Sequence, residues 1–235
     1  MSNGTILMIE DDADIREAVR ILLGNENYTI IEAENGIRGL ELMTESIDLV
    51  ILDIMMPGMS GLRTCEEIRK KSNVPVLFLT AKAKESDKLI GFMAGGDDYL
   101  TKPIGTSELL ARIRTALRHS NRLNTDSPLY KRPFHARDLT IDFEKHLVTL
   151  GEKEIHLTQI EFKIISLLAK NSGRVMTYDA IISNIWGPYA DDDNSILRVN
   201  MAHIRRKLEQ NPAEPQYIFT EIGIGYRMVE DEAGN

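Results

Sequence analysis

The stretch DLVILDIMMPG, residues 48–58, determines how the first half of this chain is interpreted. Its apolar run predicts a buried β-strand, and the Pro-Gly pair predicts a turn soon after the strand ends. Asp53 therefore stands at the carboxyl end of a buried strand. In an open α/β sheet, this edge is where ligands bind.

Short β-branched runs alternate with amphipathic stretches over residues 5–118. The alternation predicts an α/β fold, with a doubly wound, five-stranded parallel sheet in flavodoxin-like strand order. Strands are expected at residues 5–9, 28–33, 49–52, 74–79 and 98–101. Helices are expected at residues 13–23, 36–45, 61–71, 86–94 and 106–118.

The pattern changes near residue 119, where a polar stretch without periodicity predicts a linker. Beyond it, short strands lead to three helices and a final hairpin, which predicts an α+β winged helix-turn-helix domain. The predicted domains are residues 1–120 and 133–235, joined by a linker at 121–132. Strands are expected at 138–143, 146–150, 154–157, 217–222 and 225–229, and helices at 158–171, 178–186 and 195–210.

The composition excludes several classes of protein. With a net charge of −8 over 235 residues, the chain has no overall attraction for nucleic acid, so DNA binding needs a local basic patch. Cys65 is the only cysteine, which excludes intrachain disulfides and a cysteine metal cage. No apolar run approaches a membrane span and no secretory signal is visible, so we expect a cytoplasmic protein without membrane contact.

Polar groups follow the ends of three further predicted strands. An acidic run at residues 10–12 follows the first strand, Thr80 follows the fourth, and Lys102 follows the fifth. Each alone would be an ordinary loop residue, but four such strand ends argue against coincidence. Close carboxylates repel one another unless a cation joins them, and Mg²⁺ prefers oxygen ligands. Because a carboxylate can attack phosphorus to form an acyl phosphate, the pattern predicts a phosphoryl-accepting site with a divalent cation.

Residues 5–118 resemble the receiver domain of two-component response regulators. The resemblance is carried by IEDD at 9–12, LDIMMPG at 52–58, LTA at 79–81 and GDDYLTKP at 96–103. Receivers usually have Phe after the Lys-Pro pair, whereas this chain has Ile104. The resemblance implies phosphorylation by a sensor histidine kinase, and a protein that is a switch and not an enzyme.

The resemblance also implies roles for individual residues. Asp53 would be the phosphoacceptor, Thr80 and Lys102 would contact the phosphoryl group, and Tyr99 would reorient on activation. Glu10 would assist Mg²⁺ binding from the outer shell. The residues implied for the metal site are Glu10, Asp11, Asp53 and Met55, the last through its backbone carbonyl.

In the OmpR/PhoB-type subfamily, the fourth helix, fifth strand and fifth helix form a symmetric dimer through ion pairs. The resemblance therefore implies a homodimer on activation. The position of the arginine that usually pairs with Asp97 is occupied by His119 here. The residues expected at this face are Lys88, Asp97, Asp98, Glu108 and Arg112.

The last predicted helix has two distinct faces. Leu197, Met201, Ile204 and Leu208 recur at helical spacing and predict a buried stripe. Residues 198–207 carry four Lys or Arg side chains and no acid, and a third helix just before a hairpin is typical of major-groove recognition. The residues expected to face DNA are Ser195, Arg198, Val199, Asn200, Ala202, His203, Arg205, Arg206 and, from the hairpin, Arg227.

Residues 134–229 resemble the OmpR/PhoB-type winged-helix domain, through LTQIEF at 157–162, IWG at 185–187, HIRRKL at 203–208 and GIGYR at 223–227. The resemblance implies double-stranded promoter DNA as a partner. Many members carry an arginine before the first wing glycine, where this chain has Ile222. The loop at 188–194 can contact RNA polymerase in this family, and a plain polar connector explains its sequence equally well.

The regulated genes and two other functions stay open at this point. The effector end resembles KdpE-type regulators of potassium-uptake operons, whereas the receiver is closer to VanR-type regulators of glycopeptide resistance. An aspartyl-phosphate hydrolase would need an acid or base two residues after its nucleophile, where this chain has Met55. The second alternative is a DNA-binding protein whose activity does not depend on phosphorylation, and such a protein would not need the acidic pocket.

Overall fold

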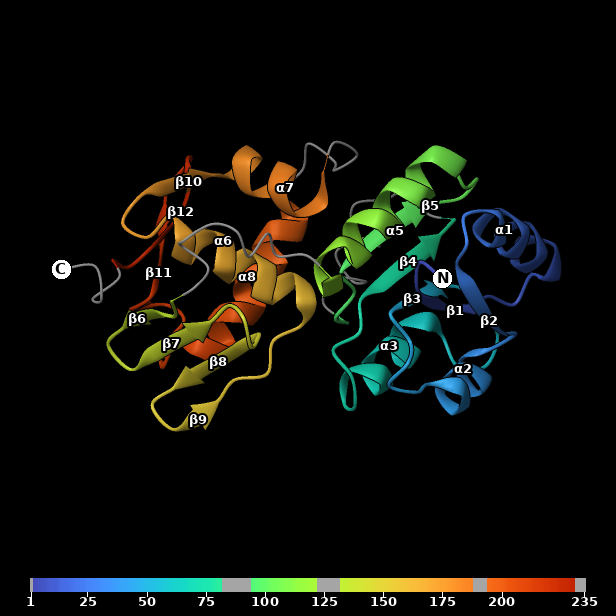
Figure 1. Ribbon diagram of the computed structural model, residues 1–235, viewed down its shortest axis with the longest axis horizontal. Helices are drawn as coiled ribbons and strands as arrows, with labels where there is room; N and C mark the ends of the chain where they lie inside the picture. Colours follow the sequence, from blue (N-terminus) through green and yellow to red (C-terminus); the bar gives the residue numbers. More distant parts are fainter. Residues whose placement is uncertain (1, 82–93, 122–131, 188–193, 231–235) are drawn as a thin grey trace. The chain divides into compact units, whose positions relative to one another are not determined.

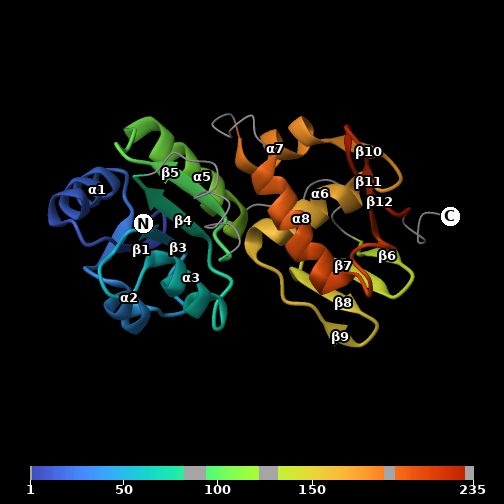
Figure 2. The ribbon, with the colours of Figure 1, turned by 180° about the vertical axis from the view of Figure 1, so that it is seen from behind.

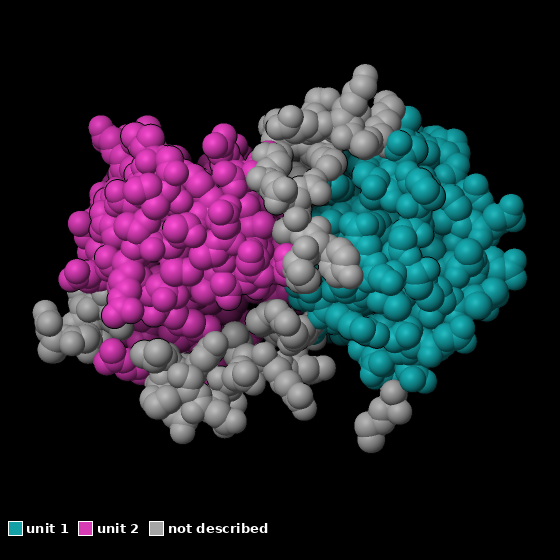
Figure 3. All heavy atoms as spheres, turned by 90° about the horizontal axis from the view of Figure 1, so that it is seen from above, with its two compact units in different colours: residues 1–121 teal, residues 122–235 magenta. Residues whose placement is uncertain are grey.

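The computed structural model describes residues 2–81, 94–121, 132–187 and 194–230. The chain divides into two compact units, residues 1–121 and 122–235 (Figure 3). Most of the predicted linker lies outside the described residues, so its bounds stay a prediction. None of the described helices combines the length and the apolarity that a membrane span requires.

The first unit is built on a parallel five-stranded sheet in the order β2-β1-β3-β4-β5, which confirms the predicted doubly wound fold. Helices α1 and α5 cover one face of this sheet, and α2 and α3 cover the other (Figure 1). Nearly all of the helix predicted at 86–94 lies outside the described residues. The strands are β1 (Thr5–Ile9), β2 (Thr29–Ala33), β3 (Leu49–Asp53), β4 (Val76–Thr80) and β5 (Asp98–Thr101). The helices are α1 (Ala13–Asn25), α2 (Gly36–Leu42), α3 (Gly61–Arg69) and α5 (Thr106–Asn121).

The sheet is buried from both sides, because continuous apolar strands need cover on each face. β3 and β4 are buried along their whole length. On one face, Met8 of β1 belongs to a core that includes Leu109 and Ile113 of α5. On the other face, α2 packs so closely that a Cβ atom at Gly39 would lie 2.3 Å from Cδ1 of Ile9.

Several predicted boundaries in this unit differ from the structure, and two of the differences have a clear local reason. Helix α2 ends at Leu42, three residues early, because Met43 takes an extended backbone conformation with φ −64° and ψ 121°. Strand β4 begins at Val76 and not at residue 74. Pro75 has no N–H to donate to the sheet, although its carbonyl accepts a hydrogen bond from the amide of Val50.

The second unit has the predicted winged helix-turn-helix arrangement. A four-stranded antiparallel sheet, β6-β7-β8-β9, is followed by three helices and by a three-stranded sheet, β10-β12-β11. Helix α8 packs against α6 (Figure 2). The helices are α6 (Gln159–Lys170), α7 (Tyr178–Trp186) and α8 (Ser195–Leu208). The strands are β6 (Phe134–Ala136), β7 (Leu139–Asp142), β8 (Leu147–Leu150), β9 (Lys153–Glu154), β10 (Val175–Thr177), β11 (Ile218–Glu221) and β12 (Gly225–Met228).

Short strands are where the sequence prediction fails in this unit. β6 and β10 were not predicted, and the strand expected at 154–157 is wrong, since β9 covers only Lys153–Glu154. Strands of two or three residues are too short to show a period of two. β6 and β10 form because β7 and β12 offer backbone groups to pair with.

Gly61 gives a test of how closely the start of α3 must approach the end of β3. A Cβ atom at Gly61 would lie 2.0 Å from the carbonyl oxygen of Asp53, so Gly61→Ala should lower the free energy of unfolding by about 1–3 kcal/mol. Gly24 lies near the end of α1, and a Cβ atom there would have no atom within 4 Å. Gly24→Ala should therefore raise the free energy of unfolding by about 0.5–1 kcal/mol. Urea unfolding of both variants measures the difference, and shifts of equal sign and size would contradict it.

Candidate functional site

Four strand ends meet at the carboxyl edge of the first sheet. Glu10 follows β1, Asp53 ends β3, Thr80 ends β4 and Lys102 follows β5. Because these four strands are neighbours in the order β1-β3-β4-β5, their ends lie side by side. The predicted site residues are therefore brought together by the sheet topology.

Three carboxylates form a cluster at this edge. Glu10, Asp11 and Asp53 each offer an oxygen, and the three oxygens lie within 4.8 Å of one another. Glu10 and Asp53 are buried, with 0% and 4% exposure, whereas Asp11 is exposed. Oδ1 of Asp53 accepts a hydrogen bond of 3.1 Å from the backbone amide of Met55. The cluster is thus open to solvent on the side of Asp11.

Lys102 supplies a positive charge to this cluster. Its Nζ lies 2.9 Å from Oδ2 of Asp53 and 2.8 Å from Oε2 of Glu10. Burial raises the pKa of Glu10 to about 7, although Lys102 opposes this. Burial alone would lower the pKa of Lys102, but its hydrogen bonds to Glu10 and Asp53 outweigh burial and raise it. The ammonium therefore stays charged and bridges two buried acids.

The cluster has the properties of a site for a hard divalent cation. Its donors are carboxylate oxygens, the atoms that Mg²⁺ prefers, and one of them faces solvent. The backbone of Met55 adjoins the cluster through its bond to Asp53. The Lys102 ammonium already pairs with two of these acids.

Thr80 and Tyr99 lie behind the cluster in β4 and β5. Thr80 is buried at the end of β4, and the ring of Tyr99 is also buried. The guanidinium carbon of Arg112 lies 5.8 Å from the centroid of the Tyr99 ring. The predicted switch aromatic is therefore packed inside the unit, against an arginine of the predicted dimer face.

Arg112 makes its ion pairs within this unit. Its guanidinium donates to both carboxylate oxygens of Asp98, at 2.8 and 2.9 Å, and to Glu108 at 2.8 Å. Burial raises the pKa of Asp98 to about 6. Lys88, the other predicted cation of this face, lies outside the described residues.

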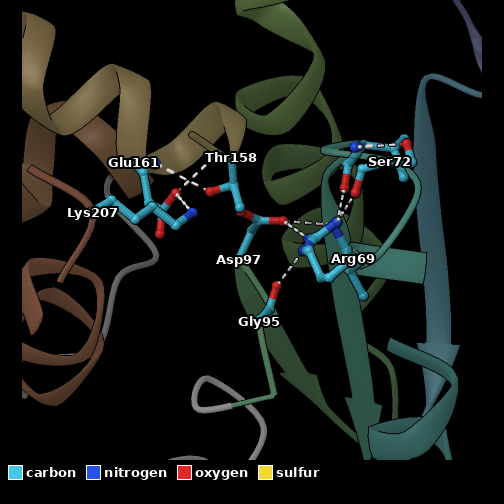
Figure 4. A network of polar contacts seen from close by, with 9 residues as sticks. Arg69, Ser72, Gly95, Asp97, Thr158, Glu161 and Lys207 are labelled. Carbon is cyan, nitrogen blue, oxygen red and sulfur yellow. Dashed lines mark hydrogen bonds and ion pairs between the residues drawn. The ribbon is translucent and has the colours of Figure 1, made fainter. Parts of the chain in front are cut away.

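Asp97 does not lie at an exposed face. Its carboxylate is 4% exposed and binds Arg69 at 2.6 Å and the backbone amide of Val76 at 2.8 Å. The Arg69 guanidinium also donates to the carbonyls of Gly95 and Val74 (Figure 4). The expectation that Asp97 contributes to a dimer face is therefore corrected, because a buried hydrogen-bond network holds it inside the unit. No sequence pattern pointed to Arg69, which lies 28 residues from Asp97 along the chain.

Helix α8 has the predicted buried stripe. Leu197, Met201, Ile204 and Leu208 are all buried. The outer surface carries two exposed arginines, Arg198 and Arg206. Burial lowers the pKa of His203, which favours the neutral imidazole. The other predicted contact residues of this surface, partly exposed, are Ser195, Val199, Ala202 and His203.

Two predicted DNA contacts on α8 are placed differently. Asn200 is 5% exposed and donates to the carbonyl of Ile196 one turn earlier, so the prediction that it reads bases is wrong. Arg205 donates to the carbonyl of Ile218 and to the hydroxyl of Thr220, each at 2.7 Å. Arg205 thus binds the helix to the hairpin β11–β12.

Two further acids hold α8 in place, and the sequence analysis missed both. The buried carboxylate of Glu161 accepts hydrogen bonds from the backbone of Thr158 and, at 2.6 Å, from Lys207 of α8 (Figure 4). The S/T-x-x-E pattern at 158–161 was the available signal for the first contact. Glu209, just after α8, accepts hydrogen bonds from three backbone amides at 216–218.

The tip of the hairpin is apolar. Ile222 is 91% exposed and Ile224 is 54% exposed. Arg227, the predicted phosphate contact, pairs with Glu221 at 2.9 Å. The hairpin therefore presents isoleucine side chains at its tip and a neutralised ion pair behind it.

Comparisons with known proteins agree with both units. Residues 6–114 match the family described as response regulator receiver domain, and residues 152–228 match transcriptional regulatory protein, C terminal. The chain is 41% identical to the KDP operon transcriptional regulatory protein KdpE of Escherichia coli K12, over 95% of this chain and 98% of that protein. It is 37% identical to the regulatory protein VanR of Enterococcus faecium, over 95% and 97%.

A solved structure extends the likeness to the fold. The response regulator DrrB of Thermotoga maritima, an OmpR/PhoB homologue, aligns with a TM-score of 0.51 and 30% identity. The alignment covers 97% of this chain and all of that one. A receiver sheet, a winged helix-turn-helix and relatives of full length thus agree, and the chain belongs to the OmpR/PhoB family of two-component response regulators, with a receiver domain and a DNA-binding domain.

Proposed function

We propose that a sensor histidine kinase phosphorylates Asp53, and that the phosphorylated chain dimerises and binds promoter DNA in the cytoplasm. One observation carries this proposal. The buried carboxylate of Asp53 has one oxygen on the Met55 amide and the other on Lys102, at the open edge of an acidic cluster.

The chemistry follows from these contacts. A carboxylate oxygen of Asp53 attacks phosphorus, the P–N bond of the kinase phosphohistidine breaks, and the leaving imidazole takes up a proton. Lys102 lies where it can neutralise charge on the transferred oxygens. Glu10, Asp11, Asp53 and the Met55 carbonyl would hold Mg²⁺, which would neutralise further charge at the phosphoryl group.

The switch follows from the residues behind the site. An acyl phosphate adds charge and acceptor oxygens beside Thr80, whose hydroxyl can turn to bond with them. That movement frees space that the buried Tyr99 ring can fill, next to Arg112. The proposed dimer face comprises Lys88, Asp98, Glu108 and Arg112. Arg112 is as buried as Asp97, at 4% exposure, but its partners Asp98 and Glu108 belong to this face, whereas Asp97 is held by Arg69 and the Val76 amide, which do not.

For DNA recognition, the exposed cations of α8 are the strongest candidates. Arg198 and Arg206 are free of the contacts that hold Arg205 to the hairpin, and an arginine in the major groove reads guanine or binds phosphate. Ser195, Val199, Ala202 and His203 line the same surface. RNA polymerase is proposed as a further partner through the loop at 188–194, of which all but Asn194 lies outside the described residues.

The regulated genes are proposed as two alternatives, potassium-uptake genes or glycopeptide-resistance genes. Sequencing the promoter fragments that the phosphorylated chain retains would decide between them. Fragments from neither class of promoter would contradict both.

The first prediction concerns the phosphoacceptor. Exposure to acetyl phosphate and Mg²⁺ should give the parent chain a labile adduct detectable by mass spectrometry, and Asp53→Asn should give none. Removing the metal with a chelator should prevent the adduct, because the acids would then repel the incoming phosphoryl group. Asp14→Asn, an exposed acid in the first turn of α1, is the matched control and should keep the adduct.

Two further measurements, a phosphoester turnover assay and a DNA-binding assay, separate the rival functions. Many turnovers of a phosphoester would support a hydrolase and contradict the switch. If Asp53→Asn with phosphodonor dimerised and bound DNA as the parent chain does, the phosphorylation-independent protein would be supported instead.

The second prediction concerns the phosphate contacts of α8. Arg198→Ala and Arg206→Ala should each weaken promoter binding and reduce the slope of log affinity against log salt by about one. Lys145→Ala removes an exposed cation of the turn between β7 and β8 and should leave the slope unchanged. Binding isotherms at several salt concentrations measure this, and equal slopes for all three variants would count against α8 as the DNA-facing helix.

The third prediction concerns the apolar tip of the hairpin. Because Ile222 is exposed and uncharged, Ile222→Arg should add one cation at the tip and steepen the salt slope by about one. Ile222→Gln, a polar substitution without charge, is the control and should not change the slope. An unchanged slope for Ile222→Arg would show that the tip stays away from the phosphates.

A further inference from the structure

Arg16 of α1 is bound to the backbone that carries two acids of the cluster. Its Nη1 donates a hydrogen bond of 2.6 Å to the carbonyl of Glu10 and one of 3.0 Å to the carbonyl of Asp11. Arg16 is partly buried, and its contacts are to backbone oxygens and not to the carboxylates. Arg16 therefore holds the backbone of the loop between β1 and α1 in place.

Other hydrogen bonds hold the loop on either side of Asp11, and they do not use the Asp11 carbonyl that Arg16 binds. The Glu10 amide donates to the carbonyl of Ala33 in the neighbouring strand. The Asp12 carboxylate caps α1 by accepting from the amides of Asp14 and Ile15. Between these two anchors, the Arg16 guanidinium joins the carbonyls of Glu10 and Asp11 to the body of α1.

Asp11 depends most on this arrangement. It is the exposed member of the cluster, so the direction of its carboxylate follows the direction of its backbone. A loop free to move would let Asp11 turn toward solvent, away from Asp53. Groups that orient metal ligands in this way commonly contribute strongly to metal affinity.

We propose that Arg16 is a positioning residue for the cation site: it fixes the loop so that the Asp11 carboxylate faces Asp53 before the ion binds. The proposal deepens the proposed function, because it rests on Mg²⁺ binding to this cluster. It assigns Arg16 no contact with the ion or with the phosphoryl group.

Electrostatics and positioning predict opposite results for removing Arg16. A positive charge this near the cluster repels a divalent cation, so the loss of charge alone would make Mg²⁺ bind more tightly. The loss of the two hydrogen bonds would let the loop move and make Mg²⁺ bind more weakly. The sign of the change therefore identifies the role.

The experiment is a calorimetric titration of the full chain with MgCl₂ and no phosphodonor. Arg16→Ala should raise the Kd for Mg²⁺ about tenfold. Arg16→Lys keeps a donor and a charge near the same carbonyls, so its Kd should lie between those of the parent and Arg16→Ala. Arg20→Ala is the matched control, because Arg20 lies one turn further along α1 and pairs with Glu17 and Glu32, away from the loop. Its Kd should equal that of the parent chain.

Unchanged or tighter Mg²⁺ binding by Arg16→Ala would overturn the proposal, and so would equal affinity of Arg16→Ala and Arg16→Lys. If Arg16→Ala does not fold, the comparison of the parent with Arg16→Lys decides, and an unchanged Kd overturns the proposal. Absence of saturable Mg²⁺ binding in the parent chain is a different outcome, since it contradicts the proposed metal site itself.

Discussion

The ion pairs of Lys102 with Glu10 and Asp53 are the interaction on which the receiver unit depends. The topology of the sheet gathers acids at one edge, and two of them are buried. Without a cation, these carboxylates would repel one another in a region of low dielectric. Removing one partner of a buried pair typically costs about 3–5 kcal/mol, more than the intact pair contributes. A positive charge therefore stabilises the cluster, which suits a site that binds a cation and a phosphoryl group.

A second polar network keeps Lys102 where it is needed. Arg69, at the end of α3, binds Asp97 and the carbonyls of Gly95 and Val74, and Asp97 also accepts from the Val76 amide. Strand β5 lies between Asp97 and Lys102, so this network anchors the start of the strand whose end carries the ammonium. A role in holding β5 explains why Asp97 is buried and not offered to a second copy of the chain.

In the second unit, the polar residues that hold α8 in place differ from the residues that α8 exposes to solvent. Lys207 binds Glu161 of α6, Arg205 binds the hairpin, and Glu209 accepts three amides just before β11. These contacts use the last turn of the helix and the residue after it. Arg198 and Arg206 stay exposed and give a locally basic surface in a unit that has no overall positive charge.

The sequence by itself determined the alternation of strands and helices, the acidic edge of the sheet and the buried stripe of α8, because these follow from periodicity and from the direction of parallel strands. The tertiary structure alone decided which polar side chains are available. Asn200 and Asp97 look like contact residues in sequence, yet one bonds to its own helix and the other to Arg69. Periodicity reports the average environment of a face, whereas the partner of a single polar group depends on residues distant along the chain. For the same reason, strands β6 and β10 exist only because their neighbours offer backbone groups to pair with.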